Sequence, residues 1–404
     1  MTTIDQLEAH GIPVTATAGG GPVETKTVVH DVDQLRSLLD VGLDQQGRQA
    51  HYEALFNGIE PAATGGAAAV ANGGVPLSQR IAAHVVGNAD LSDEDRAAIA
   101  PAFPLTVNVT AAPGPLTVSA RYDLSTPDGS PRIVSFSDVI LEQGGYFVCE
   151  STPLNFSCIT LTRTGNSGGS AADFNILGKT GATPGTPAAP AGAGQAAPGT
   201  NGECSSAGVA GDGGGPGTPG AAGTPGTAGT NGSPGTPSMQ ATITIQQALN
   251  ANELTVYSQS GSGGQGGNGG AGGLGQQGGN GGNGVSCDCT GNGGGPGGDG
   301  GTGGAGGAAG NGGNGVNAAG NVLIRVPNAP DAAKVQHTTE PAPPGAAGQP
   351  GPGGPGGGGG SGGSAGKNNS GGGTGGAGNP GATGSQGRDG TASGTAALIT
   401  VTPP

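Results

Sequence analysis

Cysteines are the residues of this chain whose type and spacing best suit chemistry, and there are five of them. Cys287 and Cys289 flank a single aspartate, and thiolates in such a cluster, together with Cys204, could bind a soft metal ion. The same residues could instead form a disulfide, because each lies in a short segment between glycine-rich stretches. We favour the disulfide, since a cross-link offsets part of the entropy that a glycine-rich chain loses on ordering.

The remaining two cysteines, Cys149 and Cys158, flank the segment 150–157 on two adjacent predicted strands. They could form a disulfide across the loop or remain two reduced, half-buried thiols. The choice depends on the redox compartment, which the sequence does not reveal, so both interpretations stay open.

No other group of side chains indicates catalysis. The five histidines have no metal-ligand spacing: His10, His30, His51, His84 and His337. Matches to glycine-rich phosphate-binding motifs follow trivially from the composition and carry no weight. The sequence therefore predicts a non-enzymatic protein without a cofactor or a metal.

A repeat of period three organises the second half of the chain. The 94 glycines and 32 prolines are concentrated in runs of Gly-Gly-X or Gly-X-Y triplets. Glycine disfavours both the α-helix and the β-strand, whereas a period of three matches the extended left-handed helix with three residues per turn. Such a helix has no internal hydrogen bonds, so its backbone must bond to neighbouring helices or to water. We predict an ordered bundle, and disorder is the main alternative.

The runs divide into six arms of 22–28 residues, each about 70–85 Å long at ~3.1 Å per residue. The arms are: arm 1, from about Thr180 to Gly202; arm 2, Gly208–Gly235; arm 3, Gly263–Gly284; arm 4, Gly291–Gly315; arm 5, Gly345–Gly366; arm 6, Gly371 to about Ala392. We expect three hairpins, with arms 3 and 4 at the centre, and short apolar strands gathered at the base.

Three turns join the arms in pairs, and we call them the tips: 203–206, 285–290 and 367–370. Their polar residues are the predicted contact surface: Glu203, Ser205, Ser206, Ser286, Asp288, Thr290, Lys367, Asn368, Asn369 and Ser370. The alternative is that turns need such residues for their geometry alone.

The first part of the chain has ordinary patterns. We expect an extension over residues 1–30 with a short helix at Ile4–Ala9, and a small helical region over 31–104, where Leu35, Leu38, Leu39 and Leu43 have helical spacing. Alternation of period two predicts a β domain of five strands over 105–170. The predicted fold class is thus mixed, with an α-helical plus β region followed by a glycine-rich bundle over 171–404.

The charge balance limits the partners. The net charge of −14 argues against nucleic acid as a partner. No stretch approaches the length of a membrane span, and the first residues do not resemble a conventional signal peptide. We expect an extracellular, cell-surface or virion location, reached by another route or by assembly into a particle.

The paired glycine-rich arms over 171–404 resemble the polyglycine-II bundle proteins, such as the springtail antifreeze protein and the distal adhesin of T-even-type phage tail fibres. Their composition is similar to that of the mycobacterial PGRS proteins. The resemblance is one of architecture and composition, so it implies a rigid bundle more strongly than any one activity.

The leading functional hypothesis is a structural or adhesive surface protein, a rod that presents its tips or assembles into a filament. Partners would then be further copies or a cell-surface or particle component, reached through the N-terminal region or the tips. An alternative is ice binding by a row of threonines in arm 2: Thr218, Thr224, Thr227, Thr230 and Thr236. A collagen-like or disordered matrix protein is the third hypothesis.

Overall fold

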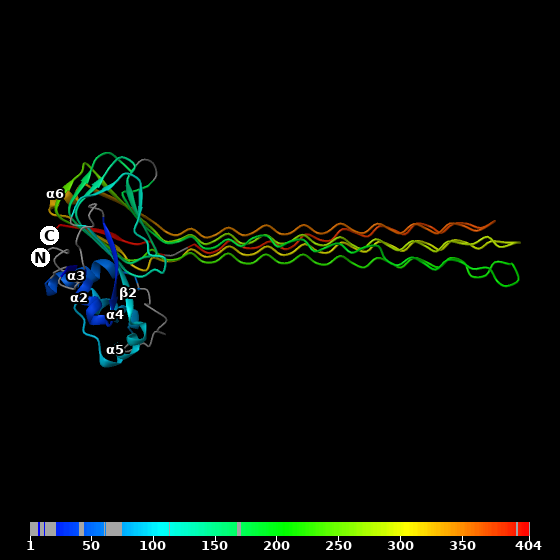
Figure 1. The fold of residues 1–404 in the computed structure, drawn as a ribbon, viewed down its shortest axis with the longest axis horizontal. Helices are drawn as coiled ribbons and strands as arrows, with labels where there is room; N and C mark the ends of the chain where they lie inside the picture. The colour runs from blue at the N-terminus through cyan, green and yellow to red at the C-terminus, as the bar shows by residue number, and fades with distance from the viewer. Residues whose placement is uncertain are drawn as a thin grey trace.

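The computed structural model describes residues 7–8, 12, 22–39, 44–59, 61, 75–112, 114–167, 171–392 and 395–403. It consists of a head, from which the six arms project as one long, narrow shaft (Figure 1). Most of the predicted helix at Ile4–Ala9, and Leu43, lie outside the described residues.

The head contains a large sheet of eight strands, in the order β1-β2-β5-β7-β9-β11-β13, with β3 beside β5. Only the β1–β2 pair is antiparallel. The strands are β1 (Val23–Val29), β2 (Leu105–Ala112), β3 (Leu116–Val118), β5 (Arg132–Leu141), β7 (Leu154–Arg163), β9 (Ala241–Asn250), β11 (Val322–Arg325) and β13 (Ile399–Thr402).

A smaller sheet has five strands in the order β12-β10-β8-β6-β4, and all its pairs are parallel. Its strands are β4 (Arg121–Asp123), β6 (Tyr146–Glu150), β8 (Phe174–Leu177), β10 (Leu254–Gln259) and β12 (Val335–Glu340).

The predicted fold class is therefore wrong, because most of the head is an α/β fold built on these two sheets. We expected a separate β domain and a small base of short strands. Instead, β7 from the predicted β domain pairs with β9, which follows arm 2, so one sheet contains strands from both regions. We predicted five strands over residues 105–170, and the structure has six. The stretch 115–124 divides into β3 and β4, which belong to different sheets.

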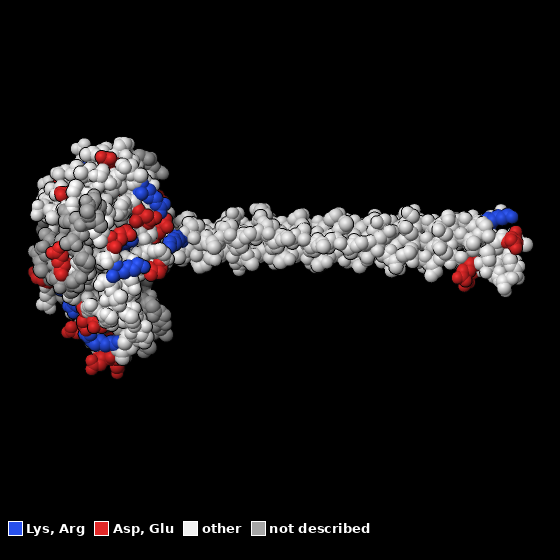
Figure 2. Space-filling model, viewed as in Figure 1, with Lys and Arg blue, Asp and Glu red and all other residues white. Residues whose placement is uncertain are grey.

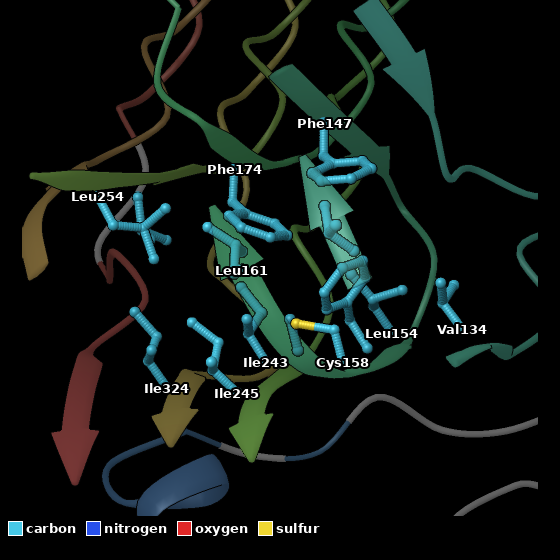
Figure 3. Packing of buried hydrophobic residues seen from close by; sticks show 14 of the residues in the cluster. Val134, Phe147, Leu154, Cys158, Leu161, Phe174, Ile243, Ile245, Leu254 and Ile324 are labelled. Carbon is cyan, nitrogen blue, oxygen red and sulfur yellow. The ribbon is translucent and has the colours of Figure 1, made fainter. Parts of the chain in front are cut away.

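The chain alternates between the sheets from β4 onward, so that it winds in coils with one strand in each sheet. Apolar side chains from both sheets fill the space between them (Figure 3). Phe174 stacks on Phe147 with ring centroids 4.9 Å apart, and Phe156 lies edge-on to Phe174 at 5.1 Å. These rings are buried together with many Val, Ile and Leu side chains, and burial of this apolar cluster stabilises the head.

Helices cover the first strands of the large sheet with a second apolar cluster, to which Val107 and Val109 of β2 contribute. Ser92 caps one of these helices by accepting a hydrogen bond from Asp95 N. The helices of this cluster are α2 (Val32–Leu39), α4 (Leu77–Val85) and α5 (Asp93–Ile99), followed by a 3-10 turn (Ala100–Ala102). The helix α3 (Gln45–Phe56) packs instead on Leu323 of β11, and the short α6 (Ala329–Ala332) contacts β13.

The three hairpins of arms are long loops between consecutive strands of the coils. Arms 1, 3 and 5 follow β8, β10 and β12 of the small sheet, and arms 2, 4 and 6 lead into β9, β11 and β13 of the large sheet. The hydrogen bonding of the sheet continues beyond its strands, since Gly178 N donates to Gln259 O at 2.9 Å and Gly181 N to Ser262 O at 2.9 Å. The two layers of the head thus extend into two layers of arms.

Each arm has three residues per turn, because every third N–H donates to the same neighbouring arm. In arm 3, Gly267, Gly270 and Gly273 donate at 2.7–2.8 Å to carbonyls of arm 2 that are also three residues apart. Arm 3 also bonds to arms 1, 4 and 5, and arm 4 bonds to arms 2, 3, 5 and 6. Arms 3 and 4 therefore occupy the two central positions, where the sequence has the most Gly-Gly-X triplets.

Close packing of the backbones explains the glycines. A Cβ built on Gly301 in arm 4 would lie 1.9 Å from the carbonyl oxygen of Ala221 in arm 2. No side chain fits at that distance, so the triplet phase of the central arms is a steric requirement.

Asparagines at the X position have a structural role as well. Asn280 Oδ1 in arm 3 accepts from Ser361 N at 3.0 Å, and Asn311 Oδ1 in arm 4 accepts from Arg388 N at 2.8 Å. These side chains bond to N–H groups at the surface of the next arm, so part of the X-position pattern serves the shaft itself.

We predict that Gly301→Ala destabilises the shaft by at least about 3 kcal/mol, because its Cβ cannot be accommodated without moving two backbones. The matched control is Gly373→Ala in arm 6, where an added Cβ meets nothing within 4 Å; we expect a change within about 0.5 kcal/mol. Denaturant unfolding of both variants checks this, and equal stability of the two would contradict the close-packed shaft.

Candidate functional site

Two histidines of the head are buried and have hydrogen-bond partners within the protein. His51 is on the buried side of α3, with Nε2 3.1 Å from Thr242 Oγ1. Burial, assisted by the charges of Arg325 and Arg48, lowers the pKa of His51 to about 3, so the ring is neutral. His84 is also buried, with Nε2 3.0 Å from Asp33 Oδ1. Within the described ranges, no three His, Cys, Asp or Glu side chains are grouped as a metal site would require.

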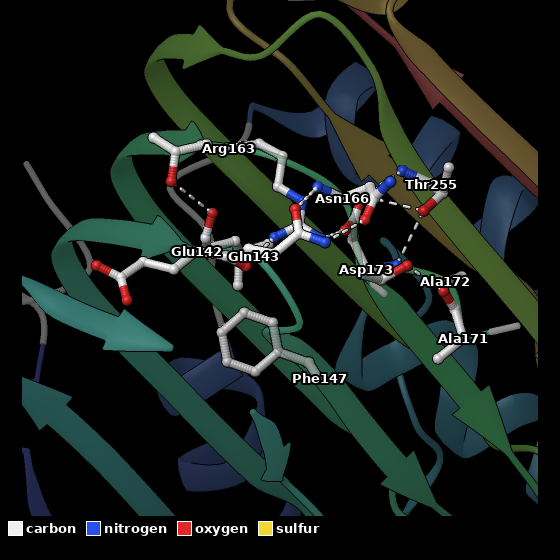
Figure 4. A network of polar contacts seen from close by, with 12 residues as sticks. Glu142, Gln143, Phe147, Arg163, Asn166, Ala171, Ala172, Asp173 and Thr255 are labelled. Carbon is white, nitrogen blue, oxygen red and sulfur yellow. Dashed lines mark hydrogen bonds and ion pairs between the residues drawn. The ribbon is translucent and has the colours of Figure 1, made fainter. Parts of the chain in front are cut away.

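A buried ion pair joins the end of β7 in the large sheet to the segment just before β8 of the small sheet (Figure 4). Arg163 Nη2 at the end of β7 lies 2.9 Å from Asp173 Oδ1, just before β8, and both side chains are less than 5% exposed. Thr255 of β10 donates to Asp173 Oδ2 through both its N–H and its hydroxyl, at 2.8 and 3.0 Å. A charge pair enclosed in this way orients strands and leaves no room for a substrate.

Of the two interpretations that the sequence left open for Cys149 and Cys158, the structure has the reduced one, because both thiols are free and buried. Cys149 lies in β6 of the small sheet and Cys158 in β7 of the large sheet, so the loop between them crosses from one sheet to the other. Burial raises the pKa of Cys149 to about 12, and it raises the pKa of Cys158 as well. Neither thiol is a reactive group in the folded protein.

The far end of the shaft collects the other three cysteines. Cys204 and Cys287 form a disulfide with a Cα–Cα distance of 5.8 Å, which links the first tip to the second. Cys289 is free and exposed. Each of these tips is a short hairpin: Ser205 N donates to Val209 O at 2.9 Å, and Cys287 N to Thr290 O at 2.8 Å.

Further hydrogen bonds combine the three tips into one surface. Ala210 N, at the start of arm 2 next to the first tip, donates to Thr290 Oγ1 of the second tip at 3.1 Å. Lys367 N donates to Ser286 Oγ at 2.9 Å, joining the second tip to the third. The polar residues of the three tips therefore lie together at one end of the molecule.

Asn292, which lies just after the second tip, was not singled out from the sequence. It is 6% exposed, its Oδ1 accepts from Val285 N at 2.6 Å, and its Nδ2 donates to Glu203 O at 3.0 Å and to Asp212 O at 2.5 Å. Its position directly after the second tip, inside a run of glycines, resembles the many surface asparagines of the arms. Only the three-dimensional arrangement distinguishes it.

The tips also concentrate charge. Lysine and acidic side chains stand at the end of the shaft, while the shaft between the tips and the head has an uncharged surface in this view (Figure 2). The exposed ionisable residues near the tips are Glu203, Asp212, Asp288 and Lys367. Val209, 43% exposed, adds an apolar side chain. Charged, polar and apolar side chains are therefore exposed together at the end of the shaft.

The threonine row of arm 2 lies on the shaft and not at the tips. Its members are all exposed: Thr218, Thr224, Thr227, Thr230 and Thr236. Thr236 is engaged by the head, since its Oγ1 lies 2.5 Å from Ser151 Oγ and 2.7 Å from Lys179 N. The carbonyls of Thr224, Thr227 and Thr230 accept hydrogen bonds from arm 3, so this part of arm 2 is fixed in place.

Comparison of the chain with protein-family models, with curated proteins and with solved structures finds no match. None of the helices in the described part of the chain has the length and apolar character that crossing a membrane requires. The candidate site is therefore defined by the geometry of the tips alone.

We predict that one thiol, Cys289, reacts quickly with Ellman's reagent in the native oxidised protein, because the other two free thiols are buried. Three thiols should react in denaturant, and all five after reduction. Cys289→Ser should abolish the fast reaction. A single reactive thiol in denaturant would show that Cys149 and Cys158 are paired after all, and several fast thiols in the native protein would contradict the tip disulfide.

Proposed function

We propose that this protein is a non-enzymatic structural or adhesive surface protein, in which the shaft holds the tips away from the head as a contact surface. The head is the part that anchors or assembles. The tips bind a partner on a cell or a particle through their polar and charged side chains. An extracellular, cell-surface or virion location belongs to the same proposal.

The observation that supports this proposal most is the distribution of ionisable groups along the molecule. Away from the tips, the six arms contain only three such residues: Asp299, Arg388 and Asp389. The first tip and the start of arm 2 contribute Glu203 and Asp212, and the other tips contribute Asp288 and Lys367. A shaft of ~75 Å, with about 24 residues per arm, separates these groups from the head.

The disulfide is the second support. It clamps the first two tips at the point where an arm hairpin would fray most easily. A shaft that served only as a spacer or an elastic linker would gain little from a fixed end. A contact surface gains a fixed arrangement of side chains, which reduces the entropy lost on binding.

The test is adhesion of beads that carry the whole chain, coupled through a tag after β13 so that the shaft points outward. The tip variant Asp288→Lys with Lys367→Glu rearranges charge at the tips without changing the net charge. The control Gln265→Glu with Gln277→Lys places the same two charges on exposed positions of arm 3. We expect wild-type beads to adhere within a panel of animal, plant and bacterial cells.

Relative to wild type, the tip variant should lose adhesion by about tenfold or more, and the shaft variant should retain it. If the two variants adhere equally well, or if no cell in the panel holds the wild-type beads, the tips are not the contact surface.

A further inference from the structure

The stack of coils in the head has two ends that are built differently. At the first end, β1 pairs antiparallel with β2, and helices cover these strands with their own apolar cluster. At the last end, β13 is the outermost strand of the large sheet and β12 that of the small sheet. No strand in the described part of the chain lies beyond them. An end strand whose backbone groups are unpaired on one side can pair with another chain.

The register of β13 identifies the backbone groups that are open. Val322 N donates to Leu398 O at 2.9 Å, so the carbonyl before Ile399 faces β11. Alternate residues of a parallel strand bond to the same neighbour, so Ile399 and Val401 direct their N–H and C=O groups away from β11. Beside them, Leu398 leaves 49% of its apolar side chain exposed.

The same reasoning applies to β12. Leu254 N donates to Lys334 O at 3.0 Å, which places the even-numbered residues of β12 toward β10. His337 and Thr339 therefore direct their backbone groups away from β10. Both outer strands have their free backbone groups on the same side of the head.

The shaft continues this open edge. Arms 5 and 6 are attached to β12 and β13, and they are the outermost arms of their layers, since arm 6 bonds to arms 4 and 5. Ala377 and Thr383 of arm 6 are exposed along it. One edge thus runs from the last coil of the head, along arms 5 and 6, to the third tip.

We propose that this edge pairs with the same edge of a second copy of the chain, related by a two-fold axis parallel to the shaft. The rotation places β13 beside β12 of the second copy and arm 6 beside its arm 5. Because β12 leads out toward the shaft and β13 leads back from it, the paired strands are antiparallel. Both shafts point the same way, and all tips lie at one end.

A second copy is the occupant that the molecule itself specifies. A partner that covers the whole edge needs two β-strands and, continuing from them, extended arms with three residues per turn. Among the described surfaces of this chain, the edge itself has both features. Within one copy, arm 6 already lies against arm 5, with Gly390 N donating to Gly345 O at 2.9 Å. The contact between copies would place exposed side chains of arm 6, such as Ala377 and Thr383, against arm 5 of the second copy. Such a self-complementary contact closes after two copies. The pairing does not depend on what the tips bind.

The test combines sedimentation velocity with small-angle scattering on the full oxidised chain, in a Cys289→Ser background that excludes disulfide-linked dimers. His337→Pro with Val401→Pro removes one outward N–H from each edge strand and leaves the bonds to β10 and β11 in place. The matched control, His337→Thr with Val401→Thr, keeps both N–H groups. A second pair, Ala377→Glu with Thr383→Glu, adds charge to the exposed edge of the shaft, far from the head.

We expect the parent chain to form dimers with a dissociation constant in the micromolar range, about 10⁻⁶–10⁻⁵ M. The proline pair and the glutamate pair should each raise that constant by about tenfold or more, while the threonine control should leave it within about twofold. The maximum dimension of the dimer should equal that of one copy. A parent chain that stays monomeric, a proline pair that dimerises like the threonine control, or a dimer much longer than one copy would overturn the proposal.

Discussion

The backbone hydrogen bond between neighbouring arms is the interaction on which the rest of this molecule depends. The arms have almost no side chains to bury, so the usual hydrophobic stabilisation is absent from the shaft. The central arms instead satisfy their N–H and C=O groups through their neighbours, at distances such as 2.9 Å from Gly310 N to Gly267 O. These bonds form only if the backbones approach closely, and that approach excludes a Cβ at positions such as Gly301.

The head supplies the order that the arms cannot generate alone. Glycine-rich chains lose much conformational entropy on ordering, and six of them must align in one register. Parallel strands of the two sheets hold the start of each outgoing arm and the end of each returning arm side by side. The disulfide between Cys204 and Cys287 fixes the opposite end, so the shaft is constrained at both ends.

The repeat of period three and the helical spacing of Leu35 and Leu38 could be predicted from the sequence, because both arise from local patterns. The joining of the strands into two sheets could not, since it depends on pairing between segments as distant as β7 and β9. β12 was missed because Val335–Glu340 is largely polar, and the polar outer face of an end strand has no alternation to detect. At the tips, the sequence indicated the turns, whereas the Cys204–Cys287 pairing and the role of Asn292 depend on arm lengths and register.

The central claim is that the shaft and the sheets form one continuous hydrogen-bonded network. NMR-detected amide hydrogen exchange tests it most directly, because it reports the opening of individual bonds. The account predicts that glycine amides of arms 3 and 4, such as Gly267 and Gly304, are protected within about tenfold of the amides of β9 and β11. Exchange of these glycines at the rate of an unstructured chain, while the sheets remain protected, would contradict it.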